Sequence, residues 1–452
     1  MNRKWIHALM IVLCLQACTA QITRFDWMQY DDPEQAGFDA TGLEKVKTQF
    51  NQMNSATLMV IRNGKVVLAM GDVSRRFMCH SMRKSIMSAM YGIYADRGDV
   101  NLYATLEELG IDDKGGLTPQ EKQARVLDLL TARSGIYHPA AYEPSGMKEN
   151  RPERGSSRPG ETFFYNNWDF NTLLTIIEKA AHIHFFDAVM QDLARPLGMQ
   201  DLRMEDMNFR FEPQSVHPAY LFKMSARDLA RFGQLYLQHG FWQGKQIIPE
   251  KWIRKSTTMY SSDLPGFEER EGYGYLWWVE QDTYTEPCYY ASGLGGQRLF
   301  VFPESGLVVV HNVNTYLNQS ERSGNIKHLV QLILNAETGP ISSDQDLTTL
   351  PQVEAPTSGA PLTPTEIGRY QRDYRHRFFG NISFMENEGI YFLKGDMLGS
   401  FRLIAATSGL FNVEDLPELM VQFLPAMPKH PQGTAETEVM ENGVPKRMVF
   451  YY

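Results

Sequence analysis

The stretch Cys79-His-Ser-Met-Arg-Lys-Ser-Ile-Met-Ser-Ala-Met-Tyr-Gly-Ile-Tyr-Ala-Asp-Arg97 decides how the chain arranges its chemistry. Its apolar residues recur at helical spacing and predict a helix over 81–97. Ser81 and Lys84 are three residues apart, so on a helix they share a face and the amine can lie beside the hydroxyl. A serine hydroxyl needs a base to become a nucleophile, and a lysine with a lowered pKa can be that base. In the first helical turn, Ser81 would also benefit from the positive end of the helix dipole.

The Ser-x-x-Lys spacing has a structural interpretation as well. Ser81 can simply cap the helix, with Lys84 as a solvated residue of its first turn. The same spacing recurs at Ser145 and Lys148, where a neighbouring proline and glycine predict a loop. The pair therefore indicates catalysis only in combination with other elements of the chain.

A second element lies further along the chain, after a Pro-Gly turn at 159–160. It reads Phe-Phe-Tyr165-Asn-Asn167. A phenol beside a lysine can relay a proton, and an asparagine amide can hold both groups and contact a substrate. The structural alternative is a buried Tyr165 followed by a turn residue at Asn167.

The third element is a glycine-rich segment directly before a predicted strand. It runs Tyr290-Ala-Ser-Gly-Leu-Gly-Gly-Gln297. Glycines at a strand edge let a substrate backbone approach closely and can expose a peptide N–H that stabilises an oxyanion. A glycine-rich hairpin turn is the alternative.

Taken in this order, the three elements resemble the motifs of the serine β-lactamase and penicillin-recognising hydrolase superfamily. With Tyr-x-Asn in the middle, the pattern resembles in particular the class C β-lactamase-like branch, which includes esterases, DD-peptidases and amide hydrolases. The resemblance covers about residues 33–336, and further similar segments lie at 33–37, 129–135, 196–199, 225–233 and 272–278.

The resemblance implies a role for each element. Ser81 would be the acylated nucleophile, Lys84 its base, and Tyr165 the group that passes the proton to the leaving group. The oxyanion hole would combine the backbone N–H of Ser81 with that of Leu294. The residues that support substrate and oxyanion would be Asn167, Ser292, Gly293 and Leu294.

The third element departs from the family pattern, because Ala291 stands where Lys-Thr-Gly has its lysine. In β-lactamases and DD-peptidases that cation helps to bind the substrate carboxylate. Its replacement favours an ester or amide substrate without such a carboxylate over a β-lactam. Arg298 could supply a charge from nearby, although on a strand its side chain can also face away.

The alternation of helices and strands predicts an α+β fold with an antiparallel sheet flanked by helices, to which the resemblance adds a helical subdomain. Residues 18–336 would form the hydrolase domain, 337–366 a Pro-rich linker, and 367–452 a small all-β, barrel-like module. Helices are expected at 81–97, 171–193 and 225–239, and strands at 56–61, 65–70, 299–303 and 306–312. In the last module, strands are expected at 381–385, 389–393, 401–405, 419–424 and 447–451.

The N-terminus has the character of an export signal. A basic start and the apolar run 8–15 precede Leu-Gln-Ala-Cys18, which looks like a bacterial lipobox. We expect residues 1–17 to be a lipoprotein signal peptide and Cys18 to carry the lipid. Cleavage after Ala20 as an ordinary secretory signal is the alternative. Either outcome predicts export to the bacterial cell envelope, and lipidation would anchor the protein to the membrane in the periplasm.

The composition excludes several classes of function. The 452 residues include 44 Lys and Arg against 53 Asp and Glu, a net charge of −9, and 43% are hydrophobic. This acidic balance argues against general nucleic-acid binding, which needs a basic surface. The chain has no zinc-ligand spacing, Gly-x-Ser-x-Gly elbow or nucleotide fingerprint. We therefore expect no metal or cofactor, and a small-molecule or peptide substrate as partner.

Two functions of different classes fit these observations. The favoured one is an exported serine hydrolase that cleaves an ester, amide or peptide bond through an acyl-enzyme on Ser81. The other is a catalytically inactive lipoprotein of the same fold that binds cell-wall peptides, supported by the altered third element.

Cys79 and Cys288 lie beside the first and third elements, which the family fold brings together. Both a disulfide and two buried thiols remain open for them.

Overall fold

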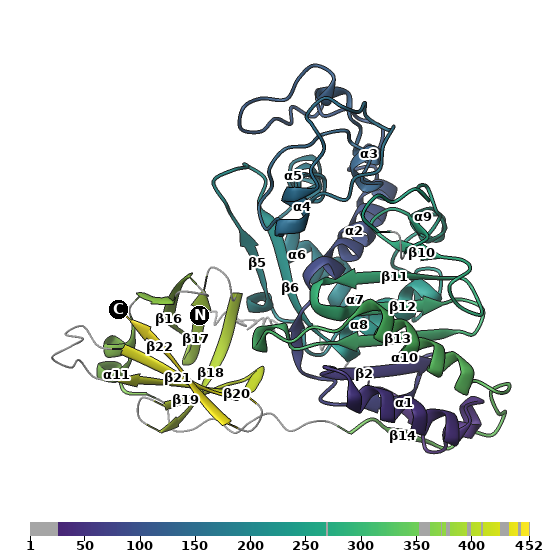
Figure 1. Ribbon diagram of the computed structural model, residues 1–452, viewed down its shortest axis with the longest axis vertical. Helices are drawn as coiled ribbons and strands as arrows, with labels where there is room; N and C mark the ends of the chain where they lie inside the picture. The colour runs from purple at the N-terminus through teal and green to yellow at the C-terminus, as the bar shows by residue number, and fades with distance from the viewer. Residues whose placement is uncertain are drawn as a thin grey trace, which may run out of the picture.

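The computed structural model describes residues 26–267, 270–351, 362–371, 373–376, 380–395, 399–407, 410–424, 434–441 and 444–451. The expected signal peptide at 1–17 and Cys18 lie outside these residues. The N-terminal part of the chain folds into a domain of a sheet and helices, and the C-terminal part folds into a β-barrel (Figure 1). Within the described ranges, no helix has both the length and the apolar character needed to cross a bilayer.

The first domain is built on a nine-stranded sheet in the order β14-β1-β3-β2-β13-β12-β11-β10-β9. Its neighbouring strands are antiparallel except for β1 and β3. The predicted strands 56–61, 65–70, 299–303 and 306–312 correspond to β2, β3, β12 and β13, and Asn63-Gly64 forms the hairpin turn with positive φ at both residues. The strands are β1 (Met28–Tyr30), β2 (Thr57–Arg62), β3 (Lys65–Met70), β9 (Gly272–Tyr273), β10 (Trp278–Glu280), β11 (Cys288–Gly293), β12 (Gln297–Phe302), β13 (Leu307–Asn312) and β14 (Leu347–Thr349).

Helices flank this sheet, which confirms the predicted fold class. The terminal helices α1 (Ala40–Gln52) and α10 (Ser323–Ala336) pack against each other, and α8 (Ala226–Leu237) packs on β2, β12 and β13 (Figure 1). Gly233 allows the close approach of α8, since a Cβ there would lie 2.6 Å from Cγ1 of Val308. The sheet is thus covered tightly where it supports the third sequence element.

Most of the remaining helices of the domain lie near α2 (Arg83–Arg97) in Figure 1, whereas α7 (Arg195–Leu197) lies next to α8. The other helices are α3 (Val126–Leu130), α4 (Ser145–Glu149), α5 (Asn167–Ala181), α6 (Phe185–Val189) and α9 (Glu250–Ser256), with a π-helical turn η4 (Met190–Ala194). Short 3-10 turns are η1 (Pro33–Ala36), η2 (His80–Met82), η3 (Glu121–Gln123), η5 (Met204–Asp206), η6 (Leu294–Gly296) and η7 (Thr315–Leu317).

Two predicted helices and one predicted loop need correction. The helix expected over 171–193 begins earlier, where Asn166 caps α5, and is interrupted at His182, whose backbone is left-handed. The loop expected at Ser145 is wrong, because Pro144 sits at the cap position of α4, where its missing N–H costs nothing. Ser81 lies in the 3-10 turn η2 that leads into α2, so α2 itself starts at Arg83.

A small antiparallel sheet leads the chain into the first sequence element. Its order is β4-β6-β5, and β4 ends directly before η2. Its strands are β4 (Arg76–Met78), β5 (Met207–Arg210) and β6 (Ala219–Ser225); a separate hairpin joins β7 (Phe241–Trp242) and β8 (Lys245–Gln246).

Part of the predicted linker 337–366 belongs to the folded units. Glu337 forms a bridge with Phe38, and β14 pairs with β1 in the main sheet. The end of the segment begins α11 (Pro364–Tyr370), where Thr363 and Glu366 form a capping box. Of the predicted linker, residues 352–361 lie outside the described part of the chain.

The C-terminal module is an antiparallel barrel of strands β15 to β22, closed by the pairing of β15 with β22. Aromatic side chains such as Tyr370, Phe384, Phe411 and Phe423 pack together in its core. The five predicted strands correspond to β16, β17, β18, β20 and β22, whereas β15, β19 and β21 were not predicted. The bounds are β15 (Asp373–His376), β16 (Gly380–Asn387), β17 (Ile390–Gly395), β18 (Gly399–Thr407), β19 (Leu410–Val413), β20 (Leu416–Leu424), β21 (Thr434–Glu441) and β22 (Val444–Tyr451).

Candidate active site

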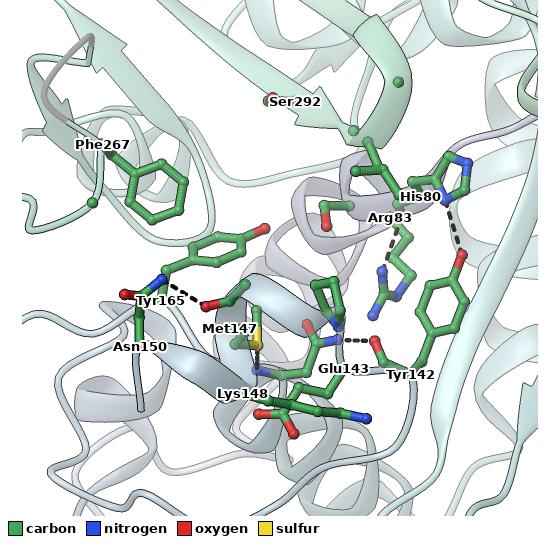
Figure 2. Close-up of a pocket in the computed structure, with 18 of the residues that line it drawn as sticks. His80, Arg83, Tyr142, Glu143, Met147, Lys148, Asn150, Tyr165, Phe267 and Ser292 are labelled. Atoms are coloured by element: carbon green, nitrogen blue, oxygen red, sulfur yellow. Dashed lines mark hydrogen bonds between the residues drawn. The ribbon is translucent and has the colours of Figure 1, made fainter. Parts of the chain in front are cut away.

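A cavity of about 880 Å³ brings the three sequence elements together. Ser81 comes from η2, Tyr165 from the segment before α5, and Ser292 from the end of β11. Figure 2 shows Tyr165, Ser292 and His80 arranged around this cavity. Segments far apart in the sequence therefore meet at one site, as the order of the motifs predicted.

The amine of Lys84 is the centre of this site. Its Nζ donates to Oγ of Ser81 and to the hydroxyl of Tyr165, each at 2.8 Å. Lys84 is only 2% exposed, and its Nζ lies 4.7 Å from the ring centre of Phe170. Trp278 stacks on the Tyr165 ring at 5.3 Å between ring centres and fixes its position. One nitrogen thus connects both hydroxyl groups.

Burial changes the proton affinity of these groups. It lowers the pKa of Lys84 well below the usual lysine range, and the neighbouring guanidinium of Arg83 lowers it further. Burial raises the pKa of the Tyr165 hydroxyl, which keeps this group protonated. A neutral amine beside a serine hydroxyl can accept its proton, and a protonated phenol can donate one.

Two residues in left-handed backbone conformation hold the turn before Ser81. His80 has φ of 48° and Tyr142 has φ of 57°. The His80 ring nitrogens lie 2.9 Å from the Tyr142 hydroxyl and 2.9 Å from Oγ1 of Thr315. Burial and the charge of the neighbouring Arg83 lower the pKa of His80 to about 3, so its ring is neutral. His80 is thus held in its strained conformation by Tyr142 on one side and Thr315 on the other, and this fixes the direction of Ser81.

Asn167 lines the cavity but makes a different contact from the expected one. Its side-chain nitrogen donates to the backbone carbonyl of Tyr142, and its backbone N–H donates to Sδ of Met147 at 3.2 Å. Oδ1 of Asn167 is buried without a hydrogen-bond partner among the described residues. Asn167 therefore supports the cavity wall.

The third element closes the cavity beside Ser81. A Cβ on Gly293 would lie 2.3 Å from the carbonyl oxygen of Cys79, so only glycine fits between β11 and the segment that carries the serine. Leu294 follows at the end of β11, lines the cavity and is 65% exposed. The strand edge and the Ser81 segment thus lie in contact, as an oxyanion site between them requires.

Arg270 is a cavity residue that the sequence did not single out. Its guanidinium donates to the hydroxyls of Tyr290 at 2.9 Å and Ser292 at 3.1 Å, and lies 4.0 Å from the ring centre of Trp278. The adjacent Glu271 anchors the segment, because its carboxylate accepts from the backbone N–H of Asp282 at 3.0 Å. No ion pair among the described residues includes Arg270. A cation therefore stands at the third element despite Ala291.

Arg298, which the sequence offered as a substitute for the family lysine, has another role. Arg298 donates to the backbone carbonyls of Gly293 at 3.2 Å and Gln297 at 2.9 Å. It braces the glycine-rich turn.

Cys79 and Cys288 are both buried and both free thiols, which decides between the two states left open for them.

Arg270 and Arg83 were missed for the same reason. Arg270 lies in the charged run Glu-Glu-Arg-Glu, and such runs are usually solvated. Arg83 is fully buried, with its guanidinium between the rings of Tyr142 and Tyr220 at 5.3 and 5.2 Å. Neither contact has a local sequence signal, because the partners come from distant segments.

A helix-flanked, largely antiparallel sheet with a Ser-Lys-Tyr cluster beside the end of one of its strands defines the class of penicillin-recognising serine hydrolases. The Beta-lactamase family model matches residues 43–332, and the chain belongs to this family. An uncharacterized protein of Alkalihalophilus pseudofirmus is 28% identical over 102 residues. That match spans 21% of this chain and 30% of the relative.

Solved structures share the fold. SurE has 20% sequence identity and a TM-score of 0.51, over 93% of this chain and 99% of that one. The penicillin-binding protein homologue from Pyrococcus abyssi has 16% identity and a TM-score of 0.50, over 91% and 99%. A penicillin-binding protein homolog from Caulobacter crescentus has 14% identity and a TM-score of 0.50, over 66% and 99%.

Proposed function

We propose that the protein is a serine hydrolase that cleaves an ester, amide or peptide bond through an acyl-enzyme on Ser81. The single observation that carries this proposal is the position of Lys84, whose buried Nζ lies 2.8 Å from both Ser81 Oγ and the Tyr165 hydroxyl. Burial by itself lowers the pKa of a lysine, so the contact with two hydroxyls that line the cavity is what distinguishes Lys84 from a structural lysine.

The proposed reaction follows from these contacts. Neutral Lys84 takes the proton of Ser81 as Oγ attacks the substrate carbonyl. Negative charge develops on the carbonyl oxygen, where the backbone N–H groups of Ser81 and Leu294 would stabilise it. Tyr165 gives its proton to the leaving group and regains one from Lys84. Water then attacks the acyl-enzyme, with the same groups moving the proton in reverse.

The position of Arg270 favours a substrate that carries an anionic group. The sequence alone favoured a substrate without a carboxylate, because Ala291 replaces the family lysine. The guanidinium of Arg270, held against Ser292 and Trp278, lies at that element and can bind a carboxylate by charge-assisted hydrogen bonds. Within the family, the Tyr165 and Asn167 pattern supports a place in the class C-like branch.

Covalent labelling tests the proposal. The protein is incubated with a fluorophosphonate or with penicillin, and its intact mass is measured. We expect an adduct on the wild type and none on Ser81→Ala, with Ser145→Ala labelled like the wild type as the control for the second Ser-x-x-Lys. No adduct with either reagent and no hydrolysis of small acyl esters would refute the hydrolase and leave the peptide-binding lipoprotein as the better account.

We also propose that the protein is exported and anchored at Cys18 by lipid. The lipobox-like Leu-Gln-Ala-Cys18 supports this proposal. Mass spectrometry of the N-terminal peptide from cells should find a diacylated Cys18, and Cys18→Ala should move the protein from the membrane to the soluble envelope fraction. A mature chain that begins at Gln21 contradicts the anchor and keeps export.

A further inference from the structure

The barrel is joined to the hydrolase domain by buried charges. Arg76 of β4 is 4% exposed, and its Nη2 lies 2.9 Å from Oδ1 of Asp415 and 3.0 Å from Oε2 of Glu414. Lys223 of β6 is 2% exposed, and its Nζ lies 3.3 Å from Oδ2 of Asp415 and 3.2 Å from Oδ1 of Asp206. Asp415 of the barrel thus bridges two buried cations on neighbouring strands of the hydrolase domain.

The charges on the two sides of this contact are complementary. The hydrolase side presents more cations than carboxylates, and the barrel side presents more carboxylates than cations. Arg75 pairs with Glu418 at 2.8 Å, Arg203 pairs with Glu414 at 2.8 Å, and the barrel's Arg402 pairs in return with Glu205. Within the hydrolase domain, Asp206 is a carboxylate partner of both buried cations, 3.6 Å from Arg76 and 3.2 Å from Lys223. Two buried cations share this one carboxylate, so Asp415 of the barrel supplies the second negative charge of the cluster.

The bridged strands lead directly to Ser81. Met78, the last residue of β4, pairs with Lys223 on β6, and the next N–H, of Cys79, donates to the carbonyl of Phe222 at 2.9 Å. His80 and Ser81 follow. A shift of β4 against β6 would therefore displace Ser81, because only His80 lies between Ser81 and the hydrogen bond from Cys79 to Phe222.

A second contact reaches the same turn from another segment. The ring of Phe401 in the barrel lies 4.3 Å from Nζ of Lys223 and packs edge-on against Tyr316 at 4.9 Å between ring centres. Tyr316 is the neighbour of Thr315, whose Oγ1 lies 2.9 Å from Nε2 of His80. Phe401 of the barrel therefore touches both β6, which pairs with the strand before His80, and the turn that holds the His80 ring.

We propose that the C-terminal barrel positions the nucleophile, with Asp415 as the positioning residue that acts through Arg76 and Lys223. This inference rests on the proposed hydrolase function. It gives the barrel a role in the reaction although its described strands contribute no residue to the cavity.

The test compares Asp415→Asn, which removes the charge at constant shape, with Glu388→Gln, which changes an exposed carboxylate of a barrel turn. Acylation by a fluorophosphonate is measured well below the unfolding temperature and separated into kinact and KI. We expect kinact of Asp415→Asn to fall on the order of 10- to 100-fold, because small misplacements of a reacting group have effects of this size. KI, and both constants of Glu388→Gln, should stay at the wild-type value, and Asp415→Glu should recover part of kinact.

Hydrogen exchange provides a readout that does not need activity. Peptides covering residues 76–85 should exchange faster in Asp415→Asn than in the wild type or in Glu388→Gln. Phe401→Ala, which leaves no charge unpaired, should have the same effect to a smaller degree if Asp415→Asn does not fold. A wild type that is never acylated refutes the proposed function, and the exchange result still decides the inference. Unchanged exchange, or unchanged kinact with only a lower unfolding temperature, overturns the positioning role.

Discussion

If the protein is the proposed hydrolase, replacing Arg270 by methionine should change which substrates it prefers. Methionine keeps an apolar contact with Trp278 and removes the charge from the third element. The bonds of Arg270 to Tyr290 and Ser292 end on neutral hydroxyls, so the variant leaves no carboxylate unpaired among the described residues. The effect should therefore appear in substrate recognition more than in folding.

The magnitude follows from the bond that a substrate anion would make to this guanidinium. A hydrogen bond to a charged group contributes about 1.5–3 kcal/mol, and about 1.4 kcal/mol corresponds to a factor of ten. We expect kcat/KM of Arg270→Met to fall roughly 10- to 150-fold for 4-acetoxybenzoate. For the neutral analogue 4-acetoxybenzamide, the constant should stay close to the wild-type value.

Arg210→Met is the matched control for this assay. Arg210 lines the same cavity, but its Nε lies 2.6 Å from Oε1 of Glu212, which already balances its charge. Its replacement should leave the ratio of the two kcat/KM values unchanged. Equal losses for the charged and the neutral ester in Arg270→Met would show that Arg270 only supports the cavity wall, and the reasoning on substrate charge would fail.

Four further outcomes are expected. Tyr165→Phe should slow acylation by about 10²- to 10⁴-fold in rapid-mixing measurements without lowering the unfolding temperature, since it removes a proton donor and little packing. Acylation should decline as the pH falls through the pKa of Lys84, because the protonated amine cannot accept a proton; burial lowers this pKa, so a pH profile that rises only in the ordinary lysine range would contradict the role. Gly293→Ala should cost about 1–3 kcal/mol in urea unfolding and impair acylation, whereas Gly324→Ala, with open space at its Cβ, should do neither. Ellman's reagent should titrate Cys79 and Cys288 only after unfolding, and a reductant should leave the melting curve unchanged.

Local patterns predicted much of the hydrolase fold. The helix behind Ser81 and the β2–β3 hairpin follow from apolar periodicity and from the Asn63-Gly64 turn, both of which act between near neighbours. Strands β15, β19 and β21 were missed because they are short or rich in charged residues, and pairing with neighbouring strands supplies what their own sequence does not.

The part of the candidate site that lies in the sequence motifs could be predicted. Spacing and order singled out Ser81, Lys84 and Tyr165, and the structure places these three in mutual contact. The position of Arg270 depends on a loop that returns to β11, and the burial of Arg83 depends on two tyrosines from distant segments. Such contacts are properties of the folded chain, so no pattern in the local sequence reports them.

The three-residue strand β14 has a consequence for handling the protein. It pairs with β1 and so occupies what would otherwise be the open edge of the main sheet. Open strand edges are templates for pairing between molecules, and a short covering strand prevents this. A hydrolase domain cut after Ala336, where α10 ends, would lose β14 and leave the backbone groups of β1 without their partners on that side. A fragment intended to keep the complete sheet should retain the chain at least through Leu350.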